Sequence, residues 1–351
     1  MRVVHMDSGL GNQMLDYAEY LAICSQNQDE KCYLENLIYE LPFKDGMFSM
    51  WNGYELGRIF GINPPNIKEK FKAESWERIL QKVEHSEFWD ENWNYAPYIT
   101  RAFEEEGVCL KNLRKKPEIP SQTPPSLKRK IRLTITRFFQ TRIGYHIKRY
   151  LRKLLANRLI KKANAEYDVF RKYPSDVYIG HSFAFKYKGF GIERIDAMIR
   201  EAFQFPDLED DKNKEMMKII QGCNAVSIHA RRSDLLFLNG HCYKFGFFRR
   251  SVKYIKRHVE NPVFIFFTDE KSVGWCEENE KIFGLNFKKD KVYFVDWNKG
   301  ENSFRDMQLM AQCKHNIFTE STFGFWGAYL NRNPDKITCA PDPMILATHS
   351  F

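Results

Sequence analysis

Two adjacent arginines stand in residues 229–234, a stretch with the sequence HARRSD that we call the arginine block. The residues before it, 225–228, are apolar and predict a buried strand. The arginine block therefore follows the carboxyl end of a strand, where open parallel sheets bind ligands. Guanidinium groups stay charged and pair with phosphate oxygens two at a time, so Arg231 and Arg232 suit a diphosphate. The alternative is a surface cluster of ion pairs with Asp234, which would contribute little.

A second polar stretch, residues 320–327 with the sequence ESTFGFWG, follows another apolar segment at 316–318. It opens a predicted helix. Hydroxyl groups at a helix start cap the helix or, together with its free amides, hold a phosphate, and the two roles are compatible. A third polar group, Asp269, follows the apolar residues 263–267. It suits hydrogen bonds from a ribose or a guanine, and equally the N-cap of a helix.

Near the start of the chain, residues 9–13 read GLGNQ and form a predicted glycine turn. Val3 and Val4 before it predict a strand, and a helical pattern runs from Met14 to Ser25 after it. Glycines let the backbone approach a ligand, and amide groups at a helix start attract an anion. The spacing is neither the dinucleotide fingerprint nor a Walker motif, so an ordinary tight turn is the alternative.

From about residue 206 onward, short apolar segments alternate with helical patterns. Such alternation predicts a parallel sheet with helices on both faces. The predicted strands lie at 225–228, 263–267, 292–295, 316–318 and 336–339, and the predicted helices at about 246–259, 270–283, 303–312 and 322–331. Three of these strands lead into the polar stretches described above, so those stretches are expected to meet at one edge of the sheet.

The composition favours a globular protein of two domains. The length of 351 residues exceeds what one core usually serves, and 43% hydrophobic residues supply apolar mass for two. No run of about 18 apolar residues predicts a transmembrane helix, and the first residues show no signal-peptide pattern, so a cytoplasmic location is expected. The eight cysteines show no CxxC spacing, which argues against a zinc site and against a disulfide framework.

The positive charge is concentrated in one segment. Between Lys128 and Lys162 there are thirteen lysines or arginines and no acidic residue, whereas the whole chain carries +9. A proline-rich stretch at 115–126 precedes this segment and is typical of a linker. Apolar residues recur every three or four positions with cations between them, which predicts an amphipathic helix or a helical hairpin.

Taken in order along the chain, these motifs resemble those of glycosyltransferase family 11, the alpha-1,2-fucosyltransferases. The resemblance covers residues 1–60 and about 176–345, and includes the glycine turn, the arginine block and the SerThrPheGly stretch at 321–324. Further matching stretches are YEL at 54–56, FTDE at 267–270, DMQLM at 306–310, CKHN at 313–316 and NPDK at 333–336.

The resemblance implies an α/β, GT-B-like fold with two Rossmann-like domains facing across a cleft. An N-terminal acceptor-side domain is expected at 1–205, and a C-terminal domain that binds the GDP-sugar at 206–351. The family core does not need residues 115–165, which are therefore expected to form a basic helical insertion in the N-terminal domain.

The resemblance also implies an enzyme, a hexosyltransferase that moves fucose from GDP-fucose to a glycan hydroxyl, in this family the 2-hydroxyl of a galactose, with inversion. No metal and no other cofactor are expected, since no DxD pair is placed to hold a metal against a diphosphate. Arg231 is expected to neutralise charge on the leaving GDP, with His229 and Asp234 orienting it. The expected donor-binding residues are Gly9, Gly11, Asn12, Arg232, Asp269, Ser321, Thr322 and Phe323.

Several residues depart from the family pattern, and they leave the acceptor and the linkage open. Ser233 stands where glycine is usual, Leu235 where tyrosine is frequent, and Asp7 and Ser8 replace a small pair before the glycine turn. Residues 181–183 read HSF and lack a usual glutamine. Transfer of another GDP-deoxyhexose, another acceptor or linkage, and a non-catalytic membrane- or nucleic-acid-binding module on a transferase fold are the alternatives. Candidates for the catalytic base are Asp7, Asp234 and Glu320.

For the basic segment the hypothesis is peripheral docking on an anionic membrane leaflet through residues 126–163, which would bring the enzyme to a lipid-linked glycan. A helical hairpin packed on the N-terminal domain is the alternative. Nucleic-acid binding is a weaker third option, because a basic patch alone gives only salt-sensitive, non-specific affinity, and no specific nucleic-acid partner is expected.

Overall fold

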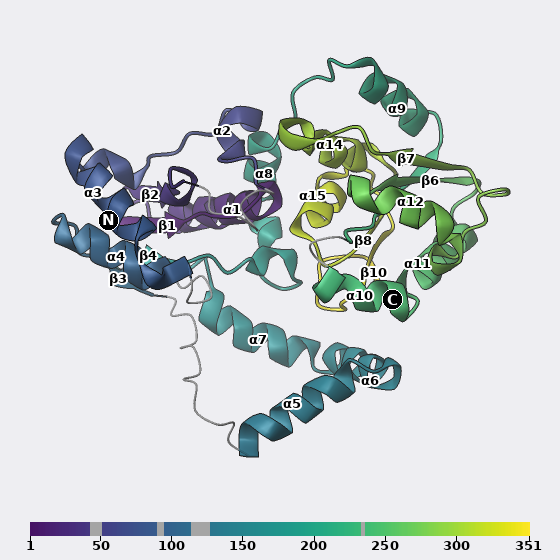
Figure 1. The fold of residues 1–351 in the computed structure, drawn as a ribbon, viewed down its shortest axis with the longest axis horizontal. Coiled ribbons are helices and arrows are strands. Elements are labelled where there is room, and N and C mark those ends of the chain that lie inside the picture. Colours follow the sequence, from purple (N-terminus) through teal and green to yellow (C-terminus); the bar gives the residue numbers. More distant parts are fainter. Residues whose placement is uncertain (43–50, 90–94, 114–126, 233–235) are drawn as a thin grey trace. The chain divides into compact units, whose positions relative to one another are not determined.

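The computed structural model describes residues 1–42, 51–89, 95–113, 127–232 and 236–351. The chain forms two compact units, which are described separately below. Unit 1 contains Met1–Pro124, Ala163–Phe185 and Phe190–Gln204, and unit 2 contains Pro125–Lys162, Lys186–Gly189 and Phe205–Phe351. Each unit has its own parallel sheet with helices around it (Figure 1). The predicted α/β class with two Rossmann-like units is therefore confirmed.

Unit 1 is built on a four-stranded parallel sheet in the order β2-β1-β4-β3. The strands are β1 (Arg2–His5), β2 (Cys32–Glu35), β3 (Lys111–Asn112) and β4 (Val177–Ile179), and the helices are α1 (Leu10–Gln26), α2 (Glu55–Phe60), α3 (Ala73–Glu84), α4 (Tyr95–Glu105) and α8 (Asp196–Ala202). Every residue of β1, β2 and β4 is buried, as expected for parallel strands covered on both faces. Polar residues of these strands are therefore buried as well.

The first helix begins earlier than its apolar spacing predicts. Leu10 is its first residue, because the carbonyl of Gly9 accepts hydrogen bonds from the amides of Asn12 and Gln13, at 2.9 and 3.1 Å. Gly11 and Asn12 therefore lie in the first turn of α1, and only Gly9 precedes it. The prediction of a five-residue turn followed by a helix from Met14 was wrong at this boundary.

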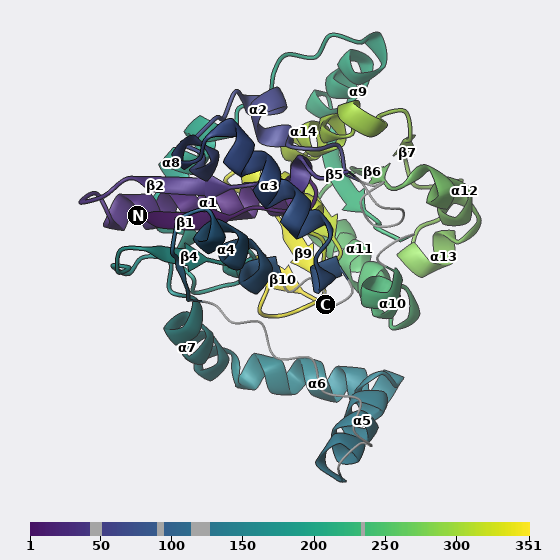
Figure 2. The ribbon, with the colours of Figure 1, turned by 60° about the vertical axis from the view of Figure 1, so that its left-hand side comes forward.

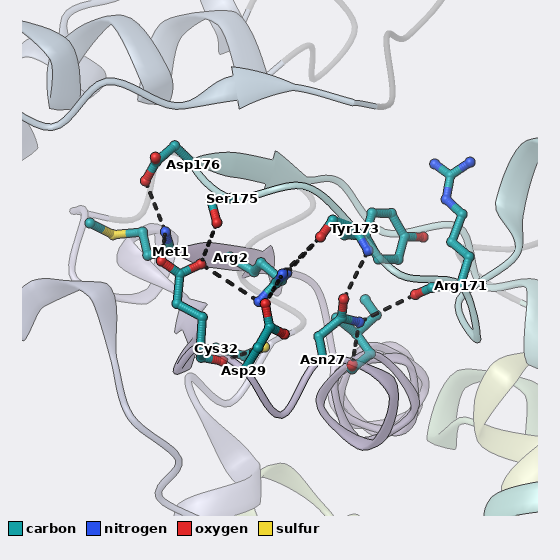
Figure 3. A network of polar contacts seen from close by, with 11 residues as sticks. Met1, Arg2, Asn27, Asp29, Cys32, Arg171, Tyr173, Ser175 and Asp176 are labelled. Carbon is teal, nitrogen blue, oxygen red and sulfur yellow. Dashed lines mark hydrogen bonds and ion pairs between the residues drawn. The ribbon is translucent and has the colours of Figure 1, made fainter.

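A polar network fixes β1 to its neighbours (Figure 3). Arg2 is 3% exposed, and its guanidinium donates from Nε and Nη2 to the carbonyl of Tyr173, at 3.0 and 2.8 Å. The same group pairs with Asp29 at 3.1 Å. Asn27, at the end of α1, accepts a hydrogen bond from the Tyr173 amide at 2.8 Å. A buried charge needs such partners, and here they join α1, β1 and the chain before β4.

Unit 2 is built on a six-stranded parallel sheet in the order β10-β9-β8-β5-β6-β7. Figure 2 labels β5, β6, β7, β9 and β10 of this sheet. The strands are β5 (Asn224–His229), β6 (Pro262–Phe267), β7 (Val292–Val295), β8 (His315–Phe318), β9 (Thr338–Ala340) and β10 (His349–Ser350). The helices are α9 (Asp211–Gln221), α10 (Leu236–Lys244), α11 (Phe247–His258), α12 (Glu270–Glu278), α13 (Glu280–Phe283), α14 (Phe304–Gln312) and α15 (Thr322–Leu330). The five strands predicted from the sequence are all present, and the short strand β10 was not predicted.

The basic segment forms α5 (Leu127–Phe139), α6 (Arg142–Leu154) and α7 (Ala156–Tyr167). Its residues up to Lys162 group with unit 2, whereas the sequence placed them in the N-terminal domain. Two arginines of α6 explain this grouping: Arg149 donates to the carbonyl of Ser350, and Arg152 pairs with Asp342 at 2.8 Å. Among the described residues, no helix of the chain is long and apolar enough to cross a bilayer.

Candidate functional site

The central strands of unit 2 end together and bring the predicted site residues to one edge of the sheet. His229, the last residue of β5, is paired in register with Phe267 at the end of β6 and with Phe318 at the end of β8. The arginine block, Asp269 and the stretch from Glu320 onward follow these three ends. Parallel strands whose carboxyl ends coincide present their loops to the same space, so this edge is the candidate site.

His229 is a buried, neutral imidazole at the base of this site. It is 4% exposed, and burial together with the nearby Arg231 lowers its pKa to about 3. Its Nδ1 atom is buried and has no hydrogen-bond partner among the described residues. The helix α15 packs against the ring, and a Cβ on Gly324 would stand 2.6 Å from Nδ1. The low pKa of His229 leaves the imidazole uncharged at neutral pH.

Arg231 is half-buried, and its backbone is clamped by two side chains of α10. Its carbonyl accepts hydrogen bonds from the Tyr243 hydroxyl at 3.0 Å and from the Asn239 amide at 3.4 Å. Asn239 is fully buried, and its side-chain oxygen accepts from the Glu320 amide at 3.0 Å. One asparagine thus joins the arginine block to the loop before α15. Asn239 was not predicted from the sequence.

The guanidinium of Arg232, which was predicted to bind the donor, lies on aromatic side chains of α10 and α12. It lies 3.6 Å from the centre of the Trp275 ring and 5.6 Å from that of Tyr243. Such a cation–π contact holds the arginine on the face of the aromatic ring. A guanidinium stacked in this way still presents N–H groups at its edge, so stacking positions Arg232 without preventing contact with a phosphate.

Asp269 supports the arginine block from the end of β6. It occupies the N-cap position of α12, but the side chain makes no capping hydrogen bond. Its carboxylate accepts from the Ser272 hydroxyl at 2.7 Å and from the backbone amide of Arg232 at 3.4 Å. The ribose or guanine contact and the N-cap position were predicted as equal alternatives, and the structure adds a third function, the bracing of the arginine block.

Ser321, Thr322 and Phe323 form the start of α15 at the same edge. Ser321 is the N-cap residue and is 9% exposed, and its side chain makes no capping hydrogen bond, contrary to the expected capping. The first amides of a helix have no partners within it and carry partial positive charge. Phe323 lies with its ring centre 5.7 Å from that of His229. This helix start and Arg231 together form a site suited to an anion.

The remaining predicted groups of this edge are Asp234 and Glu320. Asp234 lies outside the described residues, as do the departures Ser233 and Leu235. Glu320 is half-buried, and one carboxylate oxygen lies 3.6 Å from Nε2 of His241 on α10. Glu320 is therefore the candidate base that the structure places at the edge of the unit 2 sheet.

In unit 1, the glycine turn is engaged by a carboxylate of the chain itself. Glu55 is 2% exposed and accepts a hydrogen bond from the Leu10 amide at 3.1 Å. Burial raises the pKa of Glu55, and Arg58 at 3.0 Å opposes that effect. Gly9 and Asn12 border this position, at the helix start. A second anion at the same amides would meet Glu55, which disfavours a diphosphate here and favours a neutral ligand.

A histidine–carboxylate cluster lies beside the glycine turn of unit 1. His5 is completely buried: Nδ1 lies 2.5 Å from Glu35, and Nε2 lies 3.3 Å from Asp7. His181 is 14% exposed at its side chain, and its Nδ1 lies 3.5 Å from Asp7. His5, Asp7 and His181 have donor atoms within 4.8 Å of one another and could hold a metal ion, with Glu35 orienting His5 as a carboxylate does in metal sites.

The charges of this cluster stabilise one another. Burial alone would lower the pKa of His5, but Glu35 and Asp7 raise it to about 9. Burial alone would raise the pKa of Asp7, but His181 and His5 hold it well below its ordinary value. The cluster therefore contains an imidazolium between two carboxylates at neutral pH.

Backbone strain surrounds the same cluster. Ser8 has a φ of 69° and Phe183 a φ of 51°, in the left-handed region that non-glycine residues rarely adopt. The carbonyl of Ser8 is held by the Tyr39 hydroxyl at 2.7 Å and by the Gln13 amide at 2.9 Å. Phe183 stacks on His181 with ring centres 4.1 Å apart. Strain of this kind concentrates at functional sites, and here it falls on positions that depart from the family pattern.

A model described as glycosyl transferase family 11 matches residues 119–345. The matched range includes the basic segment, which the sequence analysis treated as an insertion, and excludes the glycine turn.

Among known proteins, an alpha-1,2-colitosyltransferase of Escherichia coli is 34% identical over 152 residues, which span 41% of this chain and 49% of that protein. A galactoside alpha-(1,2)-fucosyltransferase 1 of Saimiri sciureus is 32% identical over 110 residues, 30% of this chain and 28% of that protein. The matches thus span half or less of these relatives. A crystal structure of NodZ alpha-1,6-fucosyltransferase with GDP aligns with a TM-score of 0.43 at 11% identity, over 93% of this chain and 90% of that one.

Proposed function

Because the chain belongs to glycosyl transferase family 11, we propose that it transfers fucose from GDP-fucose to a hydroxyl of a glycan, with inversion and without a metal. The observation that carries this proposal is the half-buried Arg231, clamped by Asn239 and Tyr243 beside the start of α15. A guanidinium carried on a clamped backbone, together with helix amides, suits a diphosphate that gains charge as it leaves.

In the proposed reaction, the bond between the anomeric carbon and the β-phosphate oxygen breaks, and its electron pair stays on GDP. The acceptor oxygen forms its bond to the opposite face of the same carbon, and its proton passes to a carboxylate. Arg231 and the amides at Thr322 and Phe323 stabilise the departing diphosphate. Donors that are fixed before the reaction need no reorganisation as charge develops, and the held backbone of Arg231 favours such an arrangement. The 2-hydroxyl of a galactose is the proposed acceptor group, as the names of the relatives suggest.

The colitosyltransferase relative supports an alternative within the same chemistry, the transfer of another GDP-deoxyhexose. We place acceptor recognition in unit 1, at Asp7 and His181 beside the glycine turn, because Glu55 disfavours a diphosphate there. This differs from the predicted donor contact of Gly9, Gly11 and Asn12. A loose, cationic transition state needs only a weak base, so the low pKa of Asp7 is compatible with accepting the proton.

Thermal unfolding with and without GDP tests the donor site. Ligand at a hundred times its Kd stabilises the native state by about 2.7 kcal/mol, which raises the melting temperature of a chain of this size by several degrees. We expect this rise in EDTA as well as in its absence. Arg231→Lys should reduce turnover by about 10²- to 10³-fold with the fold intact, because lysine cannot fork between two oxygens. Near-normal activity of this variant, or a GDP effect abolished by EDTA, contradicts the proposal.

The proton acceptor is tested by a pair of neutral variants. Asp7→Asn and Glu320→Gln each remove one carboxylate and keep its size. If Asp7 takes the proton, the first variant loses most of the turnover and keeps the GDP-induced stabilisation, and the second retains activity. The opposite ranking assigns the role to Glu320 and removes it from Asp7.

We further propose that the enzyme contacts a membrane peripherally through residues 126–163. The outer face of α6 supports this, because Ile143, Ile147 and Leu154 are 71%, 41% and 62% exposed. Exposed apolar side chains on a cationic helix are typical of interfacial helices. Flotation with anionic liposomes, with and without residues 126–163, tests it, and equal behaviour of the two proteins would end the idea.

A further inference from the structure

Unit 2 contains a cavity whose lining shares one residue, Glu320, with the candidate site described above. Its volume is about 500 Å³, and it lies against α6, α10 and the residues after β9. The side of α6 that faces it carries Tyr145, Lys148, Arg149 and Arg152. These positions are three and four residues apart and share one face of the helix, whereas the exposed apolar residues of α6 lie on the opposite face. The cavity is therefore lined by a cationic helix face, and its lining also includes Lys244 of α10.

Three donors on this helix face are buried without partners. Nε of Arg149, Nε of Arg152 and the hydroxyl of Tyr145 have no hydrogen-bond partner among the described residues. Behind them, Nε and Nη2 of Arg250 are in the same condition. Buried donors are nearly always paired in folded proteins, and each unpaired one is costly. Three of these unpaired donors belong to side chains that line the cavity, which favours a ligand that supplies oxygen acceptors.

The charges indicate that this ligand is an anion. Four cations line the cavity, and its two carboxylates have partners: Asp342 pairs with Arg152 at 2.8 Å, and Glu320 lies 3.6 Å from His241. Burial lowers the pKa of Arg250, and the charge of Arg149 lowers it further. The arginines thus repel one another. A ligand with several acceptor oxygens and more than one negative charge would pair the free donor atoms and offset this repulsion. A phosphate or diphosphate has both properties.

We propose that this cavity is a second phosphate site, separate from the donor site, that binds the phosphate or diphosphate group of an ester. The arginines that face the cavity also attach α6 to unit 2. Arg149 donates to the carbonyl of Ser350, and Arg152 pairs with Asp342. The inference does not rest on the proposed function, since none of its residues takes part in the proposed transfer except Glu320 as an alternative base.

Calorimetric titration of the full chain with inorganic pyrophosphate, in magnesium-free buffer and with GDP in excess, tests the site. We expect pyrophosphate to bind while GDP is present. The variant Lys148→Gln/Lys244→Gln removes two exposed lining cations that have no described structural partner, and should weaken binding by about tenfold. Arg158→Gln/Lys161→Gln is the matched control: it removes the same charge from α7, outside the cavity, and should leave the affinity unchanged.

Two further arms identify the source of the phosphate. Vesicles of phosphatidylcholine with phosphatidic acid are compared with vesicles of equal surface charge made with phosphatidylglycerol. A preference for phosphatidic acid that Lys148→Gln/Lys244→Gln abolishes assigns a lipid headgroup, and pyrophosphate binding without this preference assigns a soluble phosphate ester. Either result supports the site.

The site is overturned if excess GDP abolishes pyrophosphate binding, if the control variant loses as much affinity as the lining variant, or if no pyrophosphate binds. Arg149→Lys, which keeps the charge and loses the fork, should bind pyrophosphate more weakly than the native chain and unfold at a similar temperature. If GDP does not bind, only the transferase proposal is contradicted. The comparison of Lys148→Gln/Lys244→Gln with the native chain still locates pyrophosphate at the cavity, because it does not depend on GDP binding.

Discussion

Replacing His5 by glutamine should remove a pH dependence from the stability of unit 1. Folding raises the pKa of His5 from 6.5 to about 9, chiefly because Glu35 and Asp7 outweigh the effect of burial. Between these two values the folded chain holds a proton that the unfolded chain has released. The stabilisation is therefore complete below pH 6.5 and is lost as the pH rises through 9.

The magnitude follows from the size of the shift. One pKa unit corresponds to about 1.4 kcal/mol, and the shift from 6.5 to about 9 therefore corresponds to roughly 3 kcal/mol. His5 is fully buried, so solvent does not screen this interaction. Tyr178 donates to Glu35, and Tyr95 stacks on the imidazole with ring centres 3.7 Å apart.

The assay is urea unfolding of the native chain and of His5→Gln at several values between pH 6 and 9.5, for the transition in which unit 1 unfolds. The difference in free energy between the two proteins cancels the other titrating groups. It should shrink by roughly 3 kcal/mol from pH 6.5 to 9.5. A variant of the exposed His85, His85→Gln, is the control for loss of an imidazole. A difference that is constant over this range, or that grows with pH, would refute the imidazolium between two carboxylates.

Two further variants test the edge of the sheet in unit 2. Asn239→Ala removes both hydrogen bonds that join the carbonyl of Arg231 to the amide of Glu320, and should cost about 1–3 kcal/mol of stability and weaken GDP-induced stabilisation in thermal unfolding. Gly324→Ala places a Cβ 2.6 Å from Nδ1 of His229, and should lower stability by about 1–3 kcal/mol and reduce turnover. Gly274→Ala in α12 is its control, since open space surrounds that position and alanine favours a helix; equal losses in the two glycine variants would contradict the close packing of His229.

The predictions made for unit 2 succeeded where local signals sufficed. The apolar residues 292–295 coincide with β7, and the other predicted strands lie within two residues of β5, β6, β8 and β9 at each end. Short apolar segments between helical patterns carry this information locally. The arginine block was found because its chemistry directly follows a strand, so topology alone places it at the edge of the sheet.

The contacts that fix the site could not be predicted, because they join distant residues. Asn239 contacts the backbone carbonyl of Arg231 and the backbone amide of Glu320, which is 81 residues away. Neither partner is distinguished by its residue type. His5 and Glu35 are register partners in adjacent parallel strands, which no local pattern reveals. The attachment of α6 to unit 2 depends on Arg149 and Ser350, which are 201 residues apart. Position along the chain therefore suggested the wrong unit for this helix.

The departures at Asp7, Ser8 and residues 181–183 lie in unit 1, whereas Arg231 lies in unit 2. Asp7 and His181, both departures, contact each other in unit 1, where Ser8 and Phe183 are strained around them. The clamp on Arg231 lies in unit 2 and is made by residues of its own sheet and helices. Changes at sites that share no partners have nearly additive effects on stability. Substitutions around Asp7 are therefore expected to leave the stability contribution of the clamp on Arg231 unchanged.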